Sequence, residues 1–179
     1  MAGPEEPSAV LVYVGLGSNL ADPRAQVLSA LDDLAKLPGC TLQRRSSLYA
    51  TSPVGPVDQP EFVNAVASLA TTLTPWELLA VLQGIEQAHG RVRDGTRWGP
   101  RTLDLDLLVF GEKQIQTADL QLPHPELARR AFVLVPLAEI APAGLLVPGH
   151  GHLGELLAAL EDRGGVRRIP DPVDPEESC

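Results

Sequence analysis

The order of strand-type and helix-type segments over residues 10–110 is the feature that most restricts the folds open to this chain. Strand patterns occur at 10–16, 41–51, 63–69 and 103–110, and helix patterns at 22–37 and 74–89. Because no helix pattern separates the second and third strands, the order is β-α-β-β-α-β. This order favours a split βαβ, ferredoxin-like α+β fold, an antiparallel sheet with two helices on one face. A doubly wound sheet would need a further helix.

Both expected helices carry start and stop signals. Asp22 followed by Pro23 is typical of an N-cap with proline in the first turn, and Pro38-Gly39 ends that helix. Thr74 with Glu77 three residues later forms a capping box, and Gly90 can end the second helix. The sequence therefore predicts helices on either side of the two middle strands.

Smaller elements are expected to follow this core. They are a hairpin, Gln114–Ile115 with Leu120–Leu122, and short helical stretches at 130–140 and 154–160. We expect one domain over residues 10–160. Residues 1–9 and 161–179 are expected to be disordered, since the prolines and glutamates of the second segment cannot bury much apolar surface.

The composition favours a small-molecule enzyme. A net charge of -9 over 179 residues disfavours nucleic acid and anionic lipid as partners, because both select clustered lysine and arginine. No apolar run approaches the roughly 20 residues that span a bilayer, and Glu5 and Glu6 replace the basic start of an export signal. The two cysteines, Cys40 and Cys179, support neither a disulfide framework nor a thiolate metal site. We expect a cytoplasmic monomer.

Paired carboxylates lie on the last core strand. Side chains alternate along a strand, so Asp104 and Asp106 emerge on one side, about 7 Å apart at their Cα atoms, and the neighbouring leucines on the other. Two ionised carboxylates at this spacing repel each other unless a cation lies beside them. Magnesium prefers such oxygen ligands and completes its coordination with water and phosphate oxygens. The alternative is an ordinary solvated face of an edge strand.

Positive charge is concentrated just before these carboxylates. Four of the fourteen basic residues are Arg91, Arg93, Arg97 and Arg101. Guanidinium groups bind phosphate oxygens bidentately, and arginine beside bound magnesium neutralises a polyphosphate during transfer. The segment also contains Gly95 and Gly99 around Trp98, which is typical of a lid that closes over a ligand. A nucleoside triphosphate is therefore the expected ligand.

Other motifs carry less information. Gly15-Leu16-Gly17-Ser18-Asn19 lacks the third glycine of a dinucleotide fingerprint, and a structural turn is the expected role. His124 lies between two prolines in a rigid turn that could aim it at an anion. His150 and His152 have no carboxylate or cysteine neighbours at ligand spacing and are expected to be structural.

The segment R-W-G-P-R-T-L-D-L-D-L-L at 97–108 resembles the signature of the 6-hydroxymethyl-7,8-dihydropterin pyrophosphokinase family. Further matching motifs, in the family's order, are 15–19, 51–56, 62–64, 90–93 and 123–125. The resemblance extends from about Val10 to Leu160. It implies a ferredoxin-like fold and a magnesium-dependent transfer of pyrophosphate from ATP to the hydroxymethyl group of a reduced pterin, with release of AMP, in folate biosynthesis.

The resemblance also implies roles for individual residues. The catalytic residues would be Arg91, Arg101, Asp104 and Asp106, with two Mg²⁺ ions held by Asp104 and Asp106. ATP would contact Glu86, Arg93, Arg97, Trp98, His124 and Arg130. The pterin would contact Thr51, Val54, Phe62, Asn64 and Phe132, with the two phenylalanines stacked on its faces. No general base is implied.

The chain departs from the family pattern at two positions. Some members carry tyrosine at the position of Phe62 and another where this chain has Pro125, so hydroxyl contacts there are absent while stacking at Phe62 is kept. Two other functions remain open. A polymerase-palm-like nucleotidyl transferase can place paired aspartates on the same type of sheet, and a nucleotide-sensing module would bind ATP without turnover.

Overall fold

The computed structural model describes residues 8–20, 22–51, 60–90, 103–142, 144–160 and 165–170. The first elements are β1 (Val10–Ser18), α1 (Pro23–Ala35), β2 (Cys40–Arg45), β3 (Tyr49–Thr51), β4 (Phe62–Thr71), α2 (Pro75–Ala88) and β5 (Asp104–Phe110). Then come β6 (Ile115–Gln116), β7 (Gln121–Leu122), a 3-10 turn (Leu127–Arg129), α3 (Ala131–Ile140), β8 (Leu146–Val147), β9 (Gly151–His152), α4 (Leu153–Ala158) and β10 (Arg167–Arg168).

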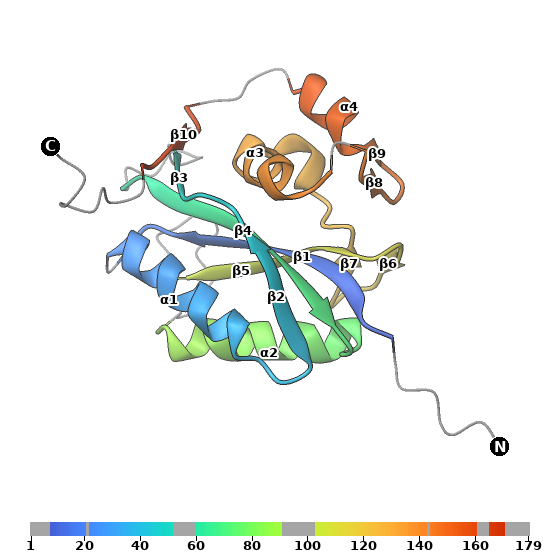
Figure 1. The fold of residues 1–179 in the computed structure, drawn as a ribbon, viewed down its shortest axis with the longest axis horizontal. Coiled ribbons are helices and arrows are strands. Elements are labelled where there is room, and N and C mark those ends of the chain that lie inside the picture. The colour runs from blue at the N-terminus through green and yellow to red at the C-terminus, as the bar shows by residue number, and fades with distance from the viewer. Residues whose placement is uncertain are drawn as a thin grey trace, which may run out of the picture.

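The main sheet has the order β10-β3-β4-β1-β5, and β2 also pairs with β4. Every pairing in it is antiparallel. Figure 1 shows α1 and α2 on one face of this sheet and α3 on the other. The expected ferredoxin-like α+β fold is confirmed, and α3 with α4 forms an additional layer.

Local sequence signals explain where the two core helices begin and end. The Asp22 carboxylate accepts the backbone N–H of Ala25 at 3.3 Å, and the Thr74 hydroxyl accepts that of Glu77 at 3.2 Å. Gly39 and Gly90 follow the helices with φ of 76° and 81°, a left-handed conformation that glycine adopts without strain. Both helix predictions are confirmed.

The single strand expected at 41–51 is interrupted. Ser46 donates its backbone N–H to the carbonyl of Val66 at 2.8 Å, while its hydroxyl accepts the N–H of Val66 at 2.9 Å. A side chain thereby takes a place in the ladder that a backbone carbonyl would occupy. The chain leaves the sheet after Ser46 and pairs with β4 again from Tyr49, so β2 and β3 are separate strands.

Part of the expected disordered C-terminal segment is ordered. Arg167 and Arg168 pair with Ala50 and Tyr49 of β3, and the N–H of Ile169 donates to the carbonyl of Leu48 at 2.8 Å. Ile169 also packs against the core. The expectation of disorder is therefore wrong for 165–170, because an unpaired edge of β3 was available to it. Residues 161–164, 171–179 and 1–7 lie outside the described ranges.

The expected hairpin and late helices are also found. Ile115 pairs with Leu122 in β6–β7, and α3 and α4 lie close to the expected 130–140 and 154–160. A second small hairpin, β8–β9, was not expected. Its strands contain two residues each, too few for a pattern of alternation to be recognised in the sequence.

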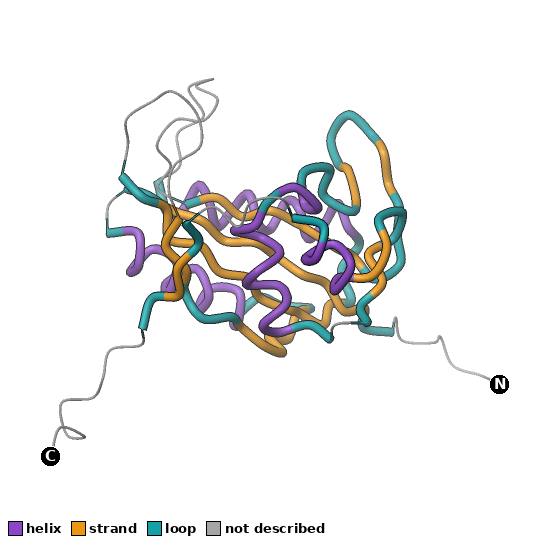
Figure 2. The backbone as a smooth tube through the Cα atoms, turned by 90° about the horizontal axis from the view of Figure 1, so that it is seen from above, coloured by secondary structure: helices purple, strands orange, loops and turns teal. Residues whose placement is uncertain are grey.

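Helix α3 crosses the strands on its face of the sheet (Figures 1 and 2). It packs through Val133, Leu134 and Leu137 onto Tyr13, Val66 and Leu108, which are buried side chains of β1, β4 and β5. At its C-terminal end the Tyr49 hydroxyl donates to Glu139 at 2.5 Å. This helix places both tyrosines of the chain in its interface with the sheet.

We predict that neither tyrosine of the folded protein is half ionised at pH 10. Burial raises the pKa of Tyr13, against a smaller lowering by Arg44; burial and then Glu139 raise the pKa of Tyr49 to about 12. Folding raises both pKa values, so the protonated tyrosines contribute to the free energy of unfolding. This contribution is complete below pH 10 and is lost as the pH rises through 10 toward 12. An ultraviolet titration of tyrosinate, repeated in denaturant, measures this. Half-ionisation at pH 10 in the folded state would contradict the packing.

Candidate active site

The alternation of β5 decides where its carboxylates point. Leu103, Leu105 and Leu107 are buried in the core cluster formed with α1 and α2. The half-buried Asp104 and Asp106 therefore face the other side of the sheet, where α3 lies. The expectation that leucines and aspartates divide between the two faces is confirmed.

Two glycines of β1 lie beside these carboxylates. Gly17 is paired with Asn64 of β4 on one side and with Asp104 on the other, and Gly15 is paired with Asp106. Directly paired residues share a face of the sheet. Since these two positions of β1 carry no side chains, the Asn64 amide can lie close to the strand at Gly17 and the Leu108 side chain at Gly15.

The glycine-containing segment is therefore part of a strand and lies at the site. The expectation of a structural turn at Gly15–Asn19 is wrong, because β1 continues to Ser18. A Cβ atom at Gly17 would lie 2.9 Å from the amide oxygen of Asn64, so glycine is needed at that point. The sequence signal was the spacing of Gly15 and Gly17, which matches the two-residue spacing of the aspartates opposite.

Three of the expected pterin contacts lie together on β3 and β4. Asn64 donates its amide N–H to the Thr51 hydroxyl at 2.8 Å, in a buried contact. Phe62 is paired with Thr51 in the ladder and is half-buried. Across β1, Asn64 and Asp104 are two strand spacings apart, roughly 10 Å between backbones.

His124 faces the aspartates from the turn after β7. Its backbone N–H donates to the carbonyl of Leu108 at 2.8 Å, and its Nδ1 accepts the N–H of Glu126 at 3.1 Å. In the neutral ring the proton is therefore on Nε2, which lies 3.9 Å from Asp106. Burial and then the charge of Arg130 lower the pKa of His124, although Asp104 and Glu126 oppose this. His124 is thus a neutral N–H donor at pH 7.

Arg130 and Phe132 come from the start of α3. The Arg130 guanidinium lies 4.0 Å from the carboxylate of Asp106 and 5.5 Å from the centre of the Phe132 ring. The ion pair exceeds hydrogen-bonding length, so this half-buried guanidinium is not tightly bound to Asp106. The turn and the helix together bring a cation, a neutral donor and an aromatic ring to one side of β5.

Glu86 of α2 is buried against the edge strand β5. It is 2% exposed, and its carboxylate accepts the backbone N–H of Leu105 at 3.1 Å. Because β5 is at the end of the sheet, this bond satisfies a strand N–H at the edge. The contact observed for Glu86 is thus one that holds β5 in place, and a contact with the nucleotide stays a prediction.

The remaining expected site residues lie outside the described ranges. They are Val54, Arg91, Arg93, Arg97, Trp98 and Arg101. Among the residues that are described, no three histidine, cysteine, aspartate or glutamate side chains gather at metal-binding distance. Magnesium needs only one or two carboxylates when phosphate oxygens and water complete its coordination, so Asp104 and Asp106 fit it. Over the same ranges, no helix is long and apolar enough to cross a membrane.

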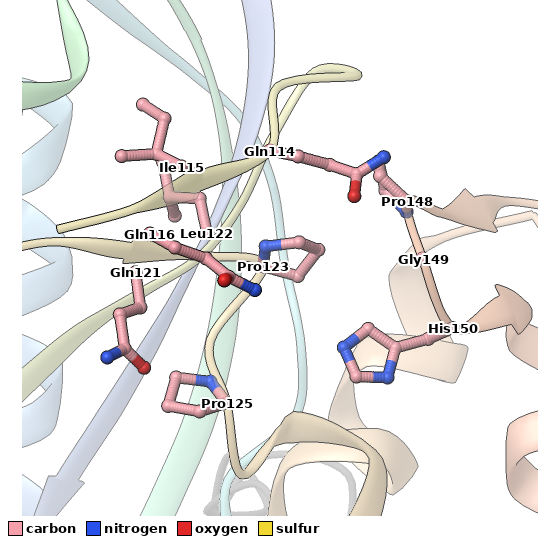
Figure 3. Close-up of a pocket in the computed structure, with 10 residues that line it drawn as sticks. All are labelled: Gln114, Ile115, Gln116, Gln121, Leu122, Pro123, Pro125, Pro148, Gly149 and His150. Atoms are coloured by element: carbon pink, nitrogen blue, oxygen red, sulfur yellow. The ribbon is translucent and has the colours of Figure 1, made fainter.

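A separate hollow lies between the two small hairpins. It has a volume of about 340 Å³, and Gln114, Gln116, Gln121 and His150 contribute polar side chains to it (Figure 3). Pro123 and Pro125 line it, so it adjoins the turn that carries His124, but neither aspartate does. His150 lines this hollow and His152 contacts the carbonyl of Gly144 at 3.2 Å, and structural roles for both stay a prediction.

Comparison with known proteins identifies the family. A family model described as 7,8-dihydro-6-hydroxymethylpterin-pyrophosphokinase (HPPK) matches residues 13–142. The chain belongs to this family. Two relatives are named 2-amino-4-hydroxy-6-hydroxymethyldihydropteridine pyrophosphokinase. The Pseudomonas aeruginosa protein is 54% identical over a match that covers 89% of this chain and 96% of the relative. The Haemophilus influenzae protein is 44% identical over a match that covers 90% of this chain and 99% of the relative.

A solved structure supports the fold. The chain is similar to Plasmodium falciparum HPPK-DHPS, wild type with pteroate, with a TM-score of 0.67 and 15% sequence identity. The match covers 87% of this chain but 43% of that longer one. At this identity the likeness concerns the shared ferredoxin-like architecture of the HPPK segment alone.

We predict that Gly17→Ala destabilises the protein and Gly15→Ala does not. A Cβ at Gly17 must displace the Asn64 amide, at 2.9 Å, from its buried bond to Thr51, which costs about 1–3 kcal/mol. A Cβ at Gly15 would lie 3.5 Å from Leu108, an ordinary contact. Urea unfolding measures both variants. Equal stability of the two would show that Asn64 is not held against Gly17.

Proposed function

We propose that the face of the sheet over β1, between Asn64 and the aspartates of β5, is where this enzyme brings ATP and its pterin substrate together. As an HPPK family member, the chain transfers pyrophosphate from ATP to hydroxymethyldihydropterin in folate biosynthesis. The observation that carries the proposal is the arrangement of Asp104 and Asp106 beside side-chain-free Gly15 and Gly17.

Asp104 and Asp106 would hold two Mg²⁺ ions together with the ATP phosphates. Their oxygen donors, their common face and their half-burial fit this metal. Bound magnesium would neutralise phosphate charge and hold the reacting groups in line. Neutral His124 would donate its Nε2–H to a phosphate oxygen, and Arg130 would pair with phosphate beside it.

The pterin would lie at the β3–β4 side of the same surface. The Thr51–Asn64 pair offers amide and hydroxyl groups to the edge of a planar heterocycle, and Phe62 and Phe132 offer rings for stacking on its faces. Val54 would line the same pocket. The roughly 10 Å between Asn64 and Asp104 is enough for a fused bicyclic ring to reach from one to the other.

The transfer itself needs in-line geometry and charge neutralisation more than covalent help from the protein. The hydroxymethyl oxygen of the pterin attacks the β-phosphorus of ATP, and the bond from that phosphorus to the oxygen it shares with the α-phosphate breaks. AMP leaves, and the hydroxyl proton passes to water or to a phosphate oxygen. Arg91 and Arg101 would stabilise the charge on the transferred group. Contacts to ATP would also come from Glu86, Arg93, Arg97 and Trp98, the last three as a lid.

The chain would act as a cytoplasmic monomer without nucleic-acid or membrane partners. The net charge of -9 supports small-molecule substrates, since a template groove or an anionic membrane would select basic surface. This charge also disfavours the nucleotidyl transferase alternative.

We predict that Asp104→Ala and Asp106→Ala each lower turnover by at least about 10²-fold, since either change removes a metal ligand. Turnover is measured as AMP formed from ATP, magnesium and 6-hydroxymethyl-7,8-dihydropterin. Asp32→Ala, at an exposed position of α1, is the control and should keep wild-type activity. Near-normal turnover in either active-site variant would remove that residue from the metal site.

The reaction products separate this function from its alternatives. The wild-type chain should form AMP and a pyrophosphorylated pterin in equal amounts, without free pyrophosphate. Chromatography of the nucleotides with phosphorus NMR measures this directly. Release of free pyrophosphate would indicate nucleotidyl transfer instead, and tight ATP binding without AMP formation would indicate a sensing module.

A further inference from the structure

A hydrogen-bonded cluster joins the far end of α3 to the sheet. One Glu139 oxygen accepts the Tyr49 hydroxyl at 2.5 Å, and the other accepts both the backbone N–H and the hydroxyl of Ser47, at 3.0 and 2.7 Å. Arg168 of β10 donates to the same Ser47 hydroxyl at 2.9 Å. The carboxylate is therefore held from β3 and from the segment just before it.

The cluster lies at the opposite end of α3 from the aspartates. Arg130, just before the helix, is beside Asp106 on β5, whereas Glu139 is bound to Tyr49 on β3. Arg130 and Glu139 are nine residues apart, which corresponds to about 13.5 Å along the helix. This length matches the distance across the sheet from β5 to β3, which is three strand spacings or about 14 Å. Helix α3 thus spans the sheet from one substrate side to the other.

Glu139 and Phe132 lie on the same face of this helix. They are seven residues apart, which at 3.6 residues per turn is two turns within about 20°. The position of Glu139 around the helix axis therefore fixes that of Phe132. Tyr49 is paired with Asn64 and lies two residues before Thr51, so these three side chains are on the same face of the sheet. The bond from Tyr49 to Glu139 therefore holds this face of the helix toward β3 and β4, which carry Thr51 and Asn64.

Apolar packing alone defines the rotation of α3 poorly. Its sequence, AFVLVPLAEI, is apolar at every position except Glu139, and its N-cap, Arg130, makes no side-chain capping bond. Apolar contacts are not directional, so such a helix can pack at more than one angle about its axis. The hydrogen bonds of Glu139 are directional and select one angle.

We propose that Tyr49, Ser47 and Glu139 are positioning residues that aim Phe132 at the pterin. The proposal rests on the proposed function, in which Phe132 stacks on the pterin ring. It extends the site to three side chains that touch neither substrate, and it makes the rotation of α3 a determinant of pterin affinity.

The first test is Tyr49→Phe, which removes the hydroxyl and keeps the ring. Pterin binding, titrated by fluorescence with magnesium and a non-hydrolysable ATP analogue, should weaken about fivefold, as expected for one lost hydrogen bond. Affinity for the analogue should change less than about twofold, because the nucleotide contacts precede the helix. Tyr13→Phe is the matched control: it removes a buried hydroxyl beneath the same helix that is not one of the donors to Glu139, and it should keep wild-type pterin affinity.

The second test combines Tyr49→Phe with Phe132→Ala. If Tyr49 acts through Phe132, its substitution should have no further effect on pterin affinity once the ring is absent. An equal loss in both backgrounds, or no loss in either, overturns the positioning role. Should Tyr49→Phe fold poorly in thermal melts, Ser47→Ala, which removes one donor to Glu139, replaces it with the same expectation.

The two proposals fail differently. If Phe132→Ala alone leaves pterin affinity unchanged, the stacking role is wrong and the positioning inference falls with it. If Phe132→Ala weakens binding while Tyr49→Phe and Ser47→Ala do not, the stacking role stands and only the inference about the cluster is overturned.

Discussion

The two-residue repeat of β5 is the constraint on which the site depends. Its leucines must pack against α1 and α2, so Asp104 and Asp106 have only the opposite face available. A register slip of one residue would turn both carboxylates into the apolar core, at a large desolvation cost. The hydrophobic effect, acting on the leucines, therefore fixes the position of the charged groups.

The two faces of the sheet are covered differently. Helices α1 and α2 lie on one face, whereas α3 crosses the other (Figure 1). Gly15 and Gly17 of the central strand share the face of the aspartates, and the side chains of Leu108 and Asn64 lie close to them. The helices beyond the ferredoxin-like core thus shape the site, while the core supplies the carboxylates.

Patterns within one segment predicted most of the fold. Periodicity and capping signals gave the order of the first strands and helices, and alternation gave the face of Asp104 and Asp106. What could not be predicted depends on partners distant in the sequence. Ser46 ends a strand because its hydroxyl accepts the backbone N–H of Val66, and β10 forms because the edge of β3 is open to it. Neither of these long-range contacts can be recognised from the local sequence pattern.

At the site, too, local patterns could be predicted and contacts between distant residues could not. The glycines of β1 suggested a turn, because glycine is typical of turns, until the pairing with Asn64 and Asp104 explained them. Contacts to the substrates could be expected from a resemblance to a family, residue by residue. The bonds of Glu139 to Tyr49 and Ser47 could not, since they join residues about ninety positions apart.

The bond between Glu86 and Leu105 fixes where the arginine-rich segment begins and ends. It joins the end of α2 to the start of β5, the two elements that residues 91–102 connect. Consecutive Cα atoms are about 3.8 Å apart, so covalent geometry alone keeps the Cα of Arg101 within roughly 11 Å of that of Asp104. Arg91 directly follows Gly90, one turn of chain beyond the buried Glu86. A carboxylate that satisfies an edge strand therefore also brings together the two ends of this segment, which supports the proposed role of its arginines beside the paired aspartates.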